Sequence, residues 1–216
     1  MKKFDFILFS LFVFAFFLFS CSKVLFKVDI DEIGTYPQPL IQPLPIRVGV
    51  YYGNVFGTSQ TIIKVKHSPT SSDYEYFVNA KMGKANIALF NYIFSHVFKE
   101  VTFIQNFREE SENLADIDII IKPKVKDCSS YHVVGLSKCE YHLFLKYFIM
   151  FYLPNKKPIG SWTIKGEGFV PYNMSFPQTL AKEGINIAMG EVAAKFMTDF
   201  CNQASIKKLF YNECNQ

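Results

Sequence analysis

A long apolar run, a short turn and a second apolar run are the features that most constrain this fold. Residues 140–152 contain only three side chains that are not apolar, namely Glu140, His142 and Lys146. Residues 158–170 follow after the turn 154–157, which reads Pro-Asn-Lys-Lys. Two runs of strand length on either side of a turn predict an antiparallel β-hairpin. The chain is therefore expected to be built around a sheet.

Both faces of the first predicted strand are apolar, because side chains alternate between the two faces of a strand. One face must pack on helices. The second is either covered within the monomer or meets a partner, since large exposed apolar patches usually mark interaction surfaces. One set of alternating residues is Tyr141, Leu143, Leu145, Tyr147, Ile149 and Phe151, and the other is Phe144, Phe148 and Met150 together with His142 and Lys146. The pattern leaves open which set faces the helices.

The remaining periodicities predict the other elements of the fold. Strands are expected at 46–52, 101–107 and 116–126 with a shorter one at 61–66, and helices at 83–100 and about 177–200. Pro123 cannot donate a hydrogen bond to a strand ladder, so its strand must end at a sheet edge or carry a bulge there. This order predicts an α+β fold, a mostly antiparallel sheet of roughly four to six strands with two amphipathic helices packed on one face.

Residues 1–20 are interpreted as a signal peptide rather than as part of the domain. Met1-Lys2-Lys3 is followed by residues 6–19, fourteen positions that are all apolar except Ser10. A helix of this length, at about 1.5 Å per residue, is too short to cross a hydrocarbon core of roughly 30 Å. A secretory signal with a cut after Ser20 is therefore expected. Eight of the 24 Phe residues belong to this segment and say nothing about the folded core.

The end of this segment and the residue after it, Leu18-Phe19-Ser20-Cys21, resemble the lipobox of bacterial lipoproteins. Phe19 stands where a smaller residue is usual. The resemblance implies that Cys21 receives a diacylglycerol, that the signal is cut before it, and that its new amino group is acylated, for example with palmitate. Such acyl chains would anchor the protein to a membrane. Ser22 resembles the outer-membrane sorting pattern, so the expected location is the cell envelope, on the outer membrane and facing the periplasm. An ordinary signal peptide with a coincidental cysteine and an uncleaved anchor are the alternatives.

The mature chain is expected to hold one domain behind a tether. Four prolines between residues 37 and 45 favour extended backbone, so 21–45 is predicted to be a lipidated N-terminus with a semi-rigid tether. Residues 46–216 are long enough for a single α+β domain. Removing residues 1–20 leaves 21 basic and 18 acidic side chains, a formal charge of +3. This mild excess argues against a nucleic-acid binder.

Without Cys21, four cysteines are left, an even number in an oxidising compartment. Three pairings are open. A bridge from Cys128 to Cys139 would staple two predicted strands, and one from Cys201 to Cys214 would pin the C-terminal tail to a helix end. Each of these two bridges would stabilise the folded protein by about 3 kcal/mol, because it lowers the conformational entropy of the unfolded chain. The alternative is four unpaired thiols, and no CxxC pair or His-Cys cluster points to a metal site.

No catalytic, cofactor-binding or metal-binding motif stands out in the sequence. The chain has no HExxH, GxSxG, GxxxxGK[ST] or GxGxxG motif. The four histidines, His67, His96, His132 and His142, are scattered along the chain. We therefore expect a protein that is not an enzyme and that has neither a cofactor nor a metal site.

One charge pattern indicates a candidate binding surface. Lysine recurs at every second residue, at Lys122, Lys124 and Lys126. On a strand, this spacing would place three ammonium groups on one face at about 7 Å intervals. They would suit contacts with an anionic ligand. The interpretation we favour is a strand made soluble by its lysines, which also discourage edge-to-edge aggregation.

In its order of elements, the segment 46–200 resembles small envelope-assembly lipoproteins: the lipopolysaccharide-assembly lipoprotein, and the domain shared by curli-secretion lipoproteins and the amino-terminal part of the Tol beta-propeller protein. Only the lipobox matches at the level of a motif. The resemblance implies a non-enzymatic accessory or assembly subunit of an envelope complex. Its partners would be the membrane, through the lipid on Cys21, and a protein partner or further copies of itself, with no nucleic acid. A carrier of an amphipathic or anionic envelope ligand is the alternative.

Overall fold

The computed structural model describes residues 25–30, 36, 42–66, 75–107, 114, 116–134, 139–171 and 176–215. Cys21 and residues 1–20 lie outside the described residues. Strands and helices follow one another as β1 (Leu25–Asp29), β2 (Leu44–Val50), β3 (Gln60–Lys66), β4 (Glu75–Lys81), α2 (Gly83–Val97), β5 (Phe98–Phe103), β6 (Ile119–Val134), β7 (Cys139–Tyr152), β8 (Pro158–Pro171), α3 (Pro177–Asp199) and α4 (Ala204–Leu209). The α+β class is confirmed.

The strands form two sheets, one of five strands in the order β5-β2-β6-β7-β8 and one of three in the order β1-β4-β3. Both sheets are mixed, because β2 runs parallel to β5 and β6, and β1 runs parallel to β4. The prediction of a mostly antiparallel sheet is therefore wrong. Two parallel neighbouring strands need a crossover connection between them, which often contains a helix. The connection from β2 to β5 contains α2, and β5 runs parallel to β2.

The predicted hairpin is confirmed as β7 and β8, which pair antiparallel along their whole length. The turn between them is closed by backbone hydrogen bonds between Leu153 and Lys157 and between Lys156 and Leu153, with Lys156 at a φ of 64°. A lysine at positive φ is uncommon, and glycine or asparagine would adopt this conformation at less cost.

Strand β6 runs through Pro123, which the sequence analysis expected at an edge or a bulge. Pairing of β6 with β2 ends at Ile121, so at Pro123 only β7 pairs with β6. The register then shifts between Val125 and Asp127. The expectation of an open side at Pro123 is confirmed, because a residue without an amide hydrogen is tolerated where one side of the strand has no partner. The bulge lies three residues further on, at Lys126, and not at Pro123 itself.

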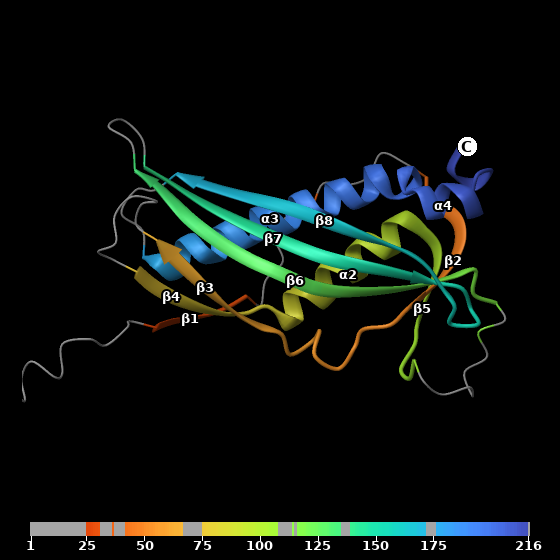
Figure 1. The fold of residues 1–216 in the computed structure, drawn as a ribbon, viewed down its shortest axis with the longest axis horizontal. Helices are drawn as coiled ribbons and strands as arrows, with labels where there is room; N and C mark the ends of the chain where they lie inside the picture. The colour runs from red at the N-terminus through yellow and green to blue at the C-terminus, as the bar shows by residue number, and fades with distance from the viewer. Residues whose placement is uncertain are drawn as a thin grey trace, which may run out of the picture.

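Helices α2 and α3 pack on one face of the five-stranded sheet, as predicted. Phe90 of α2 meets Tyr147 of β7 edge-to-face at 5.0 Å between ring centroids, and Phe94 meets Phe196 of α3 at 5.6 Å. The expected first helix is three residues too long, since Phe98 already belongs to β5. In Figure 1, β6, β7 and β8 run as long curved strands along the molecule with α3 beside them.

Segment 25–30, which was expected to be part of the tether, is instead part of the fold. β1 pairs with β4 from Leu25 to Asp29, and Val28 and Ile30 are buried in the main core. Tyr36 packs on Tyr92 of α2 at 5.1 Å. The described fold therefore begins at Leu25 rather than at Ile46, because the pairing with β4 and the burial of Val28 in β1 and of Ile30 directly after it hold this short edge strand in place.

The two ends of the molecule hold different parts of the chain. Figure 1 shows β1, β3 and β4 towards one end of the long axis and α4 with the C-terminus at the other. Within the part of the chain that the structure describes, no helix combines the length and the hydropathy needed to cross a bilayer.

Candidate functional site

The candidate site is the outer face of β6, β7 and β8, the face that points away from the helices. Along β7 the odd-numbered residues from Tyr141 to Phe151 are buried, whereas the even-numbered residues are all partly exposed. The alternation in the sequence predicted these two sets of residues, and the structure shows that the odd-numbered set faces the helices. The outer face includes Lys122, Lys124, Ser129 and Tyr131 of β6, the residues His142, Phe144, Lys146, Phe148 and Met150 of β7, and Thr163, Lys165, Glu167 and Phe169 of β8.

An aromatic cluster crosses this face, built by the register of the three strands. Tyr131, His142 and Phe169 are direct cross-strand neighbours. The rings of Tyr131 and His142 stack at 4.9 Å with 6° between their planes, and Phe169 meets His142 edge-to-face at 4.9 Å. Phe144 stacks on Tyr131 at 5.5 Å. Tyr131 and Phe169 are 37% and 42% exposed, so the cluster presents flat aromatic surface on the outside of the sheet.

Charged groups surround the cluster. His142 lies 3.7 Å from a carboxylate oxygen of Glu140 and 3.5 Å from one of Glu167. Further along the strands, Lys146 forms an ion pair with Asp127 at 3.2 Å. An apolar centre with a charged border is the usual composition of a protein-binding surface.

Part of the outer face is covered within the monomer. At its base, Ile104, Ile117 and Ile120 form a second small core, with Tyr51 and Phe107 among the rings packed against it. Beyond this base, no described element packs on the outer face. The sequence left two alternatives for the outer face, coverage within the monomer or contact with a partner. The monomer covers the face at its base, whereas the described residues leave the aromatic cluster uncovered.

The three lysines lie on the outer face but do not form a regular comb. Lys122 and Lys124 stand opposite Met150 and Phe148, and the shift in register then places Lys126 at a bulge. The Lys122 ammonium lies 4.9 Å from the ring centroid of Tyr51, and that of Lys126 lies 5.8 Å from that of Phe148. These cation–π contacts stabilise the chain itself.

A small hollow lies beside Lys122 and Lys124. It has a volume of about 280 Å³, lies between the loop 53–59 and β6, and is lined mainly by apolar atoms. Pockets for drug-sized ligands usually hold about 300–1,000 Å³, so this hollow is at the lower limit.

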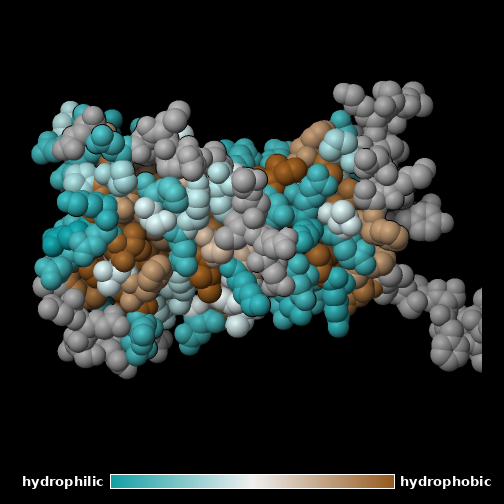
Figure 2. All heavy atoms as spheres, turned by 180° about the vertical axis from the view of Figure 1, so that it is seen from behind, coloured by the Kyte–Doolittle hydropathy of each residue, from teal (hydrophilic) through white to brown (hydrophobic). Residues whose placement is uncertain are grey.

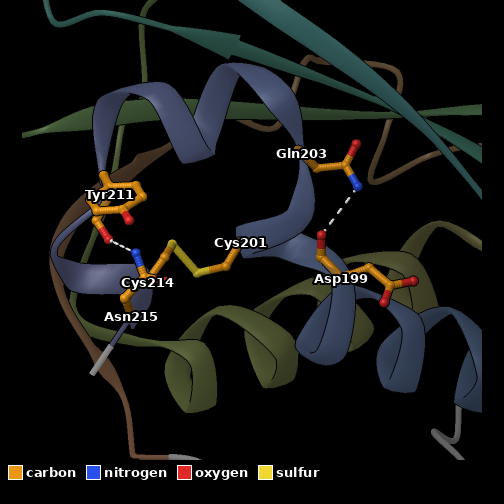
Figure 3. The surroundings of a disulfide bond; sticks show 6 residues. All are labelled: Asp199, Cys201, Gln203, Tyr211, Cys214 and Asn215. Atoms are coloured by element: carbon orange, nitrogen blue, oxygen red, sulfur yellow. Dashed lines mark hydrogen bonds between the residues drawn. A yellow bond between two sulfur atoms is a disulfide. The ribbon is translucent and has the colours of Figure 1, made fainter.

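The structure joins Cys201 and Cys214, with 5.5 Å between their Cα atoms. Figure 3 shows this bridge between the end of α3 and the C-terminal turn, next to the hydrogen bond from the Gln203 side chain to the Asp199 carbonyl. The bridge considered for Cys128 and Cys139 does not form. Cys128 pairs with Leu145 and Cys139 with Val134, so the two cysteines stand six positions apart on the ladder, about 20 Å.

The thiol of Cys128 is buried and free. Burial, and to a lesser extent the charge of Asp127, raises its pKa to about 12. A thiol of this kind is a poor nucleophile and a structural residue. Nearby on the same inward face, the His132 ring bonds the Tyr76 hydroxyl at 2.9 Å. Within the described residues, no three His, Cys, Asp or Glu side chains gather as a metal site would require.

Tyr131 and Phe169 were missed as site residues in the sequence analysis. The predicted strand stopped at Lys126, because the residues that follow, Asp-Cys-Ser-Ser, read as a loop, whereas β6 continues to Val134. Strand β8 was predicted, but the exposure of Phe169 follows from the packing of its neighbours Gly168 and Val170 on the inner face. The alternation of Phe169 with those two residues is the signal that could have identified it.

Comparison with known proteins yields structural likeness only. No protein family matches the chain, and no curated protein matches it in sequence. Solved structures similar to it include a protein assigned to DUF330 from Xanthomonas campestris (12% identity, 81% of this chain and 92% of that one, TM-score 0.45). Others are a protein described as a neuraminyllactose-binding hemagglutinin homolog from Helicobacter pylori (12%, 84% and 95%, TM-score 0.49) and a minor lipoprotein from Acinetobacter baumannii (11%, 77% and 96%, TM-score 0.40). At TM-scores below 0.5 these likenesses establish neither a shared family nor a shared function.

Proposed function

We propose that this chain is a membrane-anchored, periplasm-facing lipoprotein and a non-enzymatic accessory or assembly subunit of a cell-envelope complex. The anchor is the lipid on Cys21, inferred from the lipobox-like residues 18–21. The protein docks on its partner, or on further copies of itself, through the outer face of β6, β7 and β8.

The observation that carries this proposal is the aromatic cluster of Tyr131, His142, Phe144 and Phe169. Its rings lie side by side across three strands and are left uncovered by the described residues. In a monomer these rings stabilise the sheet through their contacts with one another, but their outward surfaces stay in water. Aromatic residues are enriched at the centres of protein interfaces, because they contribute large contact areas at a low cost in side-chain entropy.

A photo-crosslinking experiment in the native envelope tests the proposal. A photoreactive phenylalanine replaces Phe169, which is 42% exposed, and in a matched control it replaces Ile187 of α3, which is 41% exposed. Position 169 should give one dominant adduct, either with an envelope protein or with a second copy. Adding Tyr131→Glu, which puts a carboxylate beside the stacked rings, should reduce this adduct by about tenfold. A protein that runs as a monomer and gives no more adduct at 169 than at 187 would contradict the proposal.

A second candidate function is a carrier of an amphipathic, anionic ligand. The observation that favours it is the 280 Å³ hollow with apolar lining next to Lys122 and Lys124. An acyl chain would occupy the hollow while its acidic group meets an ammonium at the border.

Titration with a dansyl-labelled fatty acid tests the carrier function on the purified protein. The substitutions Lys122→Glu, Lys124→Glu and Lys126→Glu together should abolish saturable binding. The control carries Lys207→Glu and Lys208→Glu, two exposed residues of α4, and should bind like the parent. Unchanged binding by the triple variant would rule out this candidate.

A further inference from the structure

The distance between the anchor and the fold is short. Leu25, the first residue of β1, follows Cys21 by four residues. Four residues span at most about 14 Å even when fully extended. The polar layer on each side of a bilayer's hydrocarbon core is roughly 5–8 Å thick. A lipid on Cys21 therefore holds Leu25 at or just above the membrane surface.

Strand β1 is bound firmly to the rest of the domain. Its backbone pairs with β4 over five residues, and Val28 and Ile30 are buried in the main core. Asp29 forms an ion pair with Lys81 at 3.0 Å, and the Ile30 amide donates a hydrogen bond to the Lys81 carbonyl at 3.1 Å. An anchor on Cys21 therefore positions the whole three-stranded sheet β1-β4-β3, called the small sheet below, near the membrane.

The outer face of the small sheet is amphipathic. Leu25 pairs with Phe77, and Ile62 pairs with Asn79, which is the next residue of β4 on the same face as Phe77. Leu25 and Ile62 are 50% and 62% exposed, and Phe77 is half-buried. These three apolar side chains form a diagonal that begins at the end of β1 nearest Cys21. Figure 2 shows hydrophobic residues at the surface at this end of the molecule, among hydrophilic ones.

Positive charge lies beside this diagonal. Lys27 is exposed and pairs with Asn79 on the same face. Lys81 is also half exposed, although Asp29 neutralises it. Among the described residues no carboxylate pairs with Lys27. Exposed apolar side chains next to such a lysine suit a surface of anionic lipid headgroups, where each basic residue contributes about 1 kcal/mol of attraction.

We propose that the outer face of β1, β4 and β3 lies against the surface of the membrane that holds the anchor. The proposal rests on the lipidation of Cys21 proposed above. Contact of Leu25, Ile62 and Phe77 with the headgroup region restricts the orientation of the domain and keeps the small sheet closer to the membrane than α4, which lies at the other end of the molecule.

Tryptophan quenching by lipids measures this contact. The mature, lipidated protein is reconstituted in vesicles of phosphatidylethanolamine and phosphatidylglycerol that carry bromine on the acyl chains. Trp162, the single tryptophan, is replaced by Phe. A new tryptophan then replaces either Ile62, which is 62% exposed, or Tyr211, which is 61% exposed. Tyr211 follows α4, and α4 lies at the other end of the molecule from the small sheet.

Tryptophan at 62 should be quenched at least about threefold more strongly than tryptophan at 211, because only the first lies at the interface. Leu25→Trp should behave like Ile62→Trp and serves as a second probe. Lys27→Glu should weaken the quenching at 62 in these vesicles. Equal quenching at 62 and 211 would overturn the proposal.

The outcomes separate this proposal from the anchor on which it rests. The mass of the mature N-terminus is measured first, and an unmodified Cys21 overturns both. A lipidated Cys21 with equal quenching at the two positions overturns only the membrane contact. In a third outcome, bromine does not quench the tryptophan at 62, and its protection from acrylamide increases with protein concentration. This outcome would assign the face to contact with a second copy and would also overturn the membrane contact.

Discussion

The hydroxyl of Tyr147 on β7 donates a hydrogen bond to Oδ1 of Asn86 on α2, in the fully buried centre of the protein. The amide nitrogen of the same Asn86 donates to Ser59 Oγ at 2.8 Å. One asparagine thus connects the long hairpin, the first helix and the loop that precedes β3. Burial raises the pKa of the Tyr147 hydroxyl well above its usual value, which keeps it a neutral donor.

Replacement of Tyr147 by Phe should therefore be costly. The ring would keep its edge-to-face contact with Phe90, but the Asn86 oxygen would lose its donor. A buried acceptor left without a partner costs about 1–3 kcal/mol of unfolding free energy. Urea unfolding measures this loss. Tyr211→Phe, at a 61% exposed side chain, is the control and should cost less than about 0.5 kcal/mol. Equal effects of the two substitutions would contradict the role given to this bond.

Gly168 of β8 allows α3 to approach the sheet closely. A Cβ atom at Gly168 would lie 1.9 Å from the Gly184 carbonyl oxygen of α3. Gly168→Ala should push the helix away and cost about 1–3 kcal/mol, as overpacking usually does.

Gly190→Ala is the matched control on the helix itself. The nearest atom to a Cβ at Gly190 is a ring carbon of Tyr36 at 4.0 Å, so there is room for a methyl group. Because alanine favours a helix over glycine by about 1 kcal/mol, this substitution should leave the urea midpoint unchanged or raise it. A loss of stability at Gly190 as large as at Gly168 would show that the close approach is not the cause.

The Cys201–Cys214 bridge should contribute to thermal stability. It joins residues 13 apart in sequence and holds the C-terminal turn against the end of α3. Closing a loop of this size stabilises by about 3 kcal/mol, and at about 2–4 °C per kcal/mol for a chain of this size the unfolding temperature should fall by roughly 6–12 °C on reduction. Calorimetry with and without a reductant measures the change. The double variant Cys201→Ser, Cys214→Ser should unfold at the lower temperature in both conditions.

The ion pair of Arg47 and Asp118 should make the protein sensitive to acid. The Asp118 carboxylate accepts hydrogen bonds from the backbone amide of Arg47 at 2.8 Å and from its guanidinium at 3.0 Å. Burial alone would raise the pKa of Asp118, but the hydrogen bonds and the positive charge of Arg47 outweigh it and lower the pKa below 3.8. A lowered pKa means that the stabilisation is present above pH 3.8 and is lost as the pH falls through the folded-state pKa.

Asp118→Asn should therefore lower the urea midpoint at pH 7 and have little effect at a pH below the folded-state pKa. Asp116→Asn is the control, because Asp116 is 84% exposed and lies 3.5 Å from the same guanidinium. Its effect at pH 7 should be smaller, since exposed pairs contribute little. A pH-independent effect of Asp118→Asn would contradict the assignment.

The local pattern of side chains predicted the elements of this fold better than their arrangement. The alternation from Tyr141 to Phe151 predicted which side chains of β7 share a face, because the period of a strand is a local property. It left open which of the two faces is buried, and the structure shows that it is the odd-numbered one. The expected helix stripe comprised Ile87, Phe90, Phe94, Val97 and Val101. Phe90, Phe94 and Val97 are buried in α2, whereas Ile87 is half-buried and Val101 belongs to β5. By contrast, β1 was read as a tether, because five residues with two inward apolar side chains carry little signal until β4 pairs with them.

The candidate site was predicted in part for the same reason. Phe144 and His142 follow from the alternation of β7 alone. Their contact with Tyr131 requires β6 to continue past the Asp-Cys-Ser-Ser stretch, and that strand is stabilised by pairing with β7 rather than by its own propensity. The cluster therefore depends on how β6, β7 and β8 are aligned with one another, and the sequence of a single strand does not determine this alignment.

The long hairpin, the two amphipathic helices and the pairing candidates among the cysteines could all be predicted from residues that lie near one another in the chain. The parallel direction of β2, the bridge at Cys201 rather than Cys128, and the entry of the chain into its sheet four residues after Cys21 depend on the folded arrangement. The difference comes from the range of the interactions. Periodicity and turn chemistry act between residues close in sequence, whereas strand partners and disulfides are chosen by packing between segments tens of residues apart.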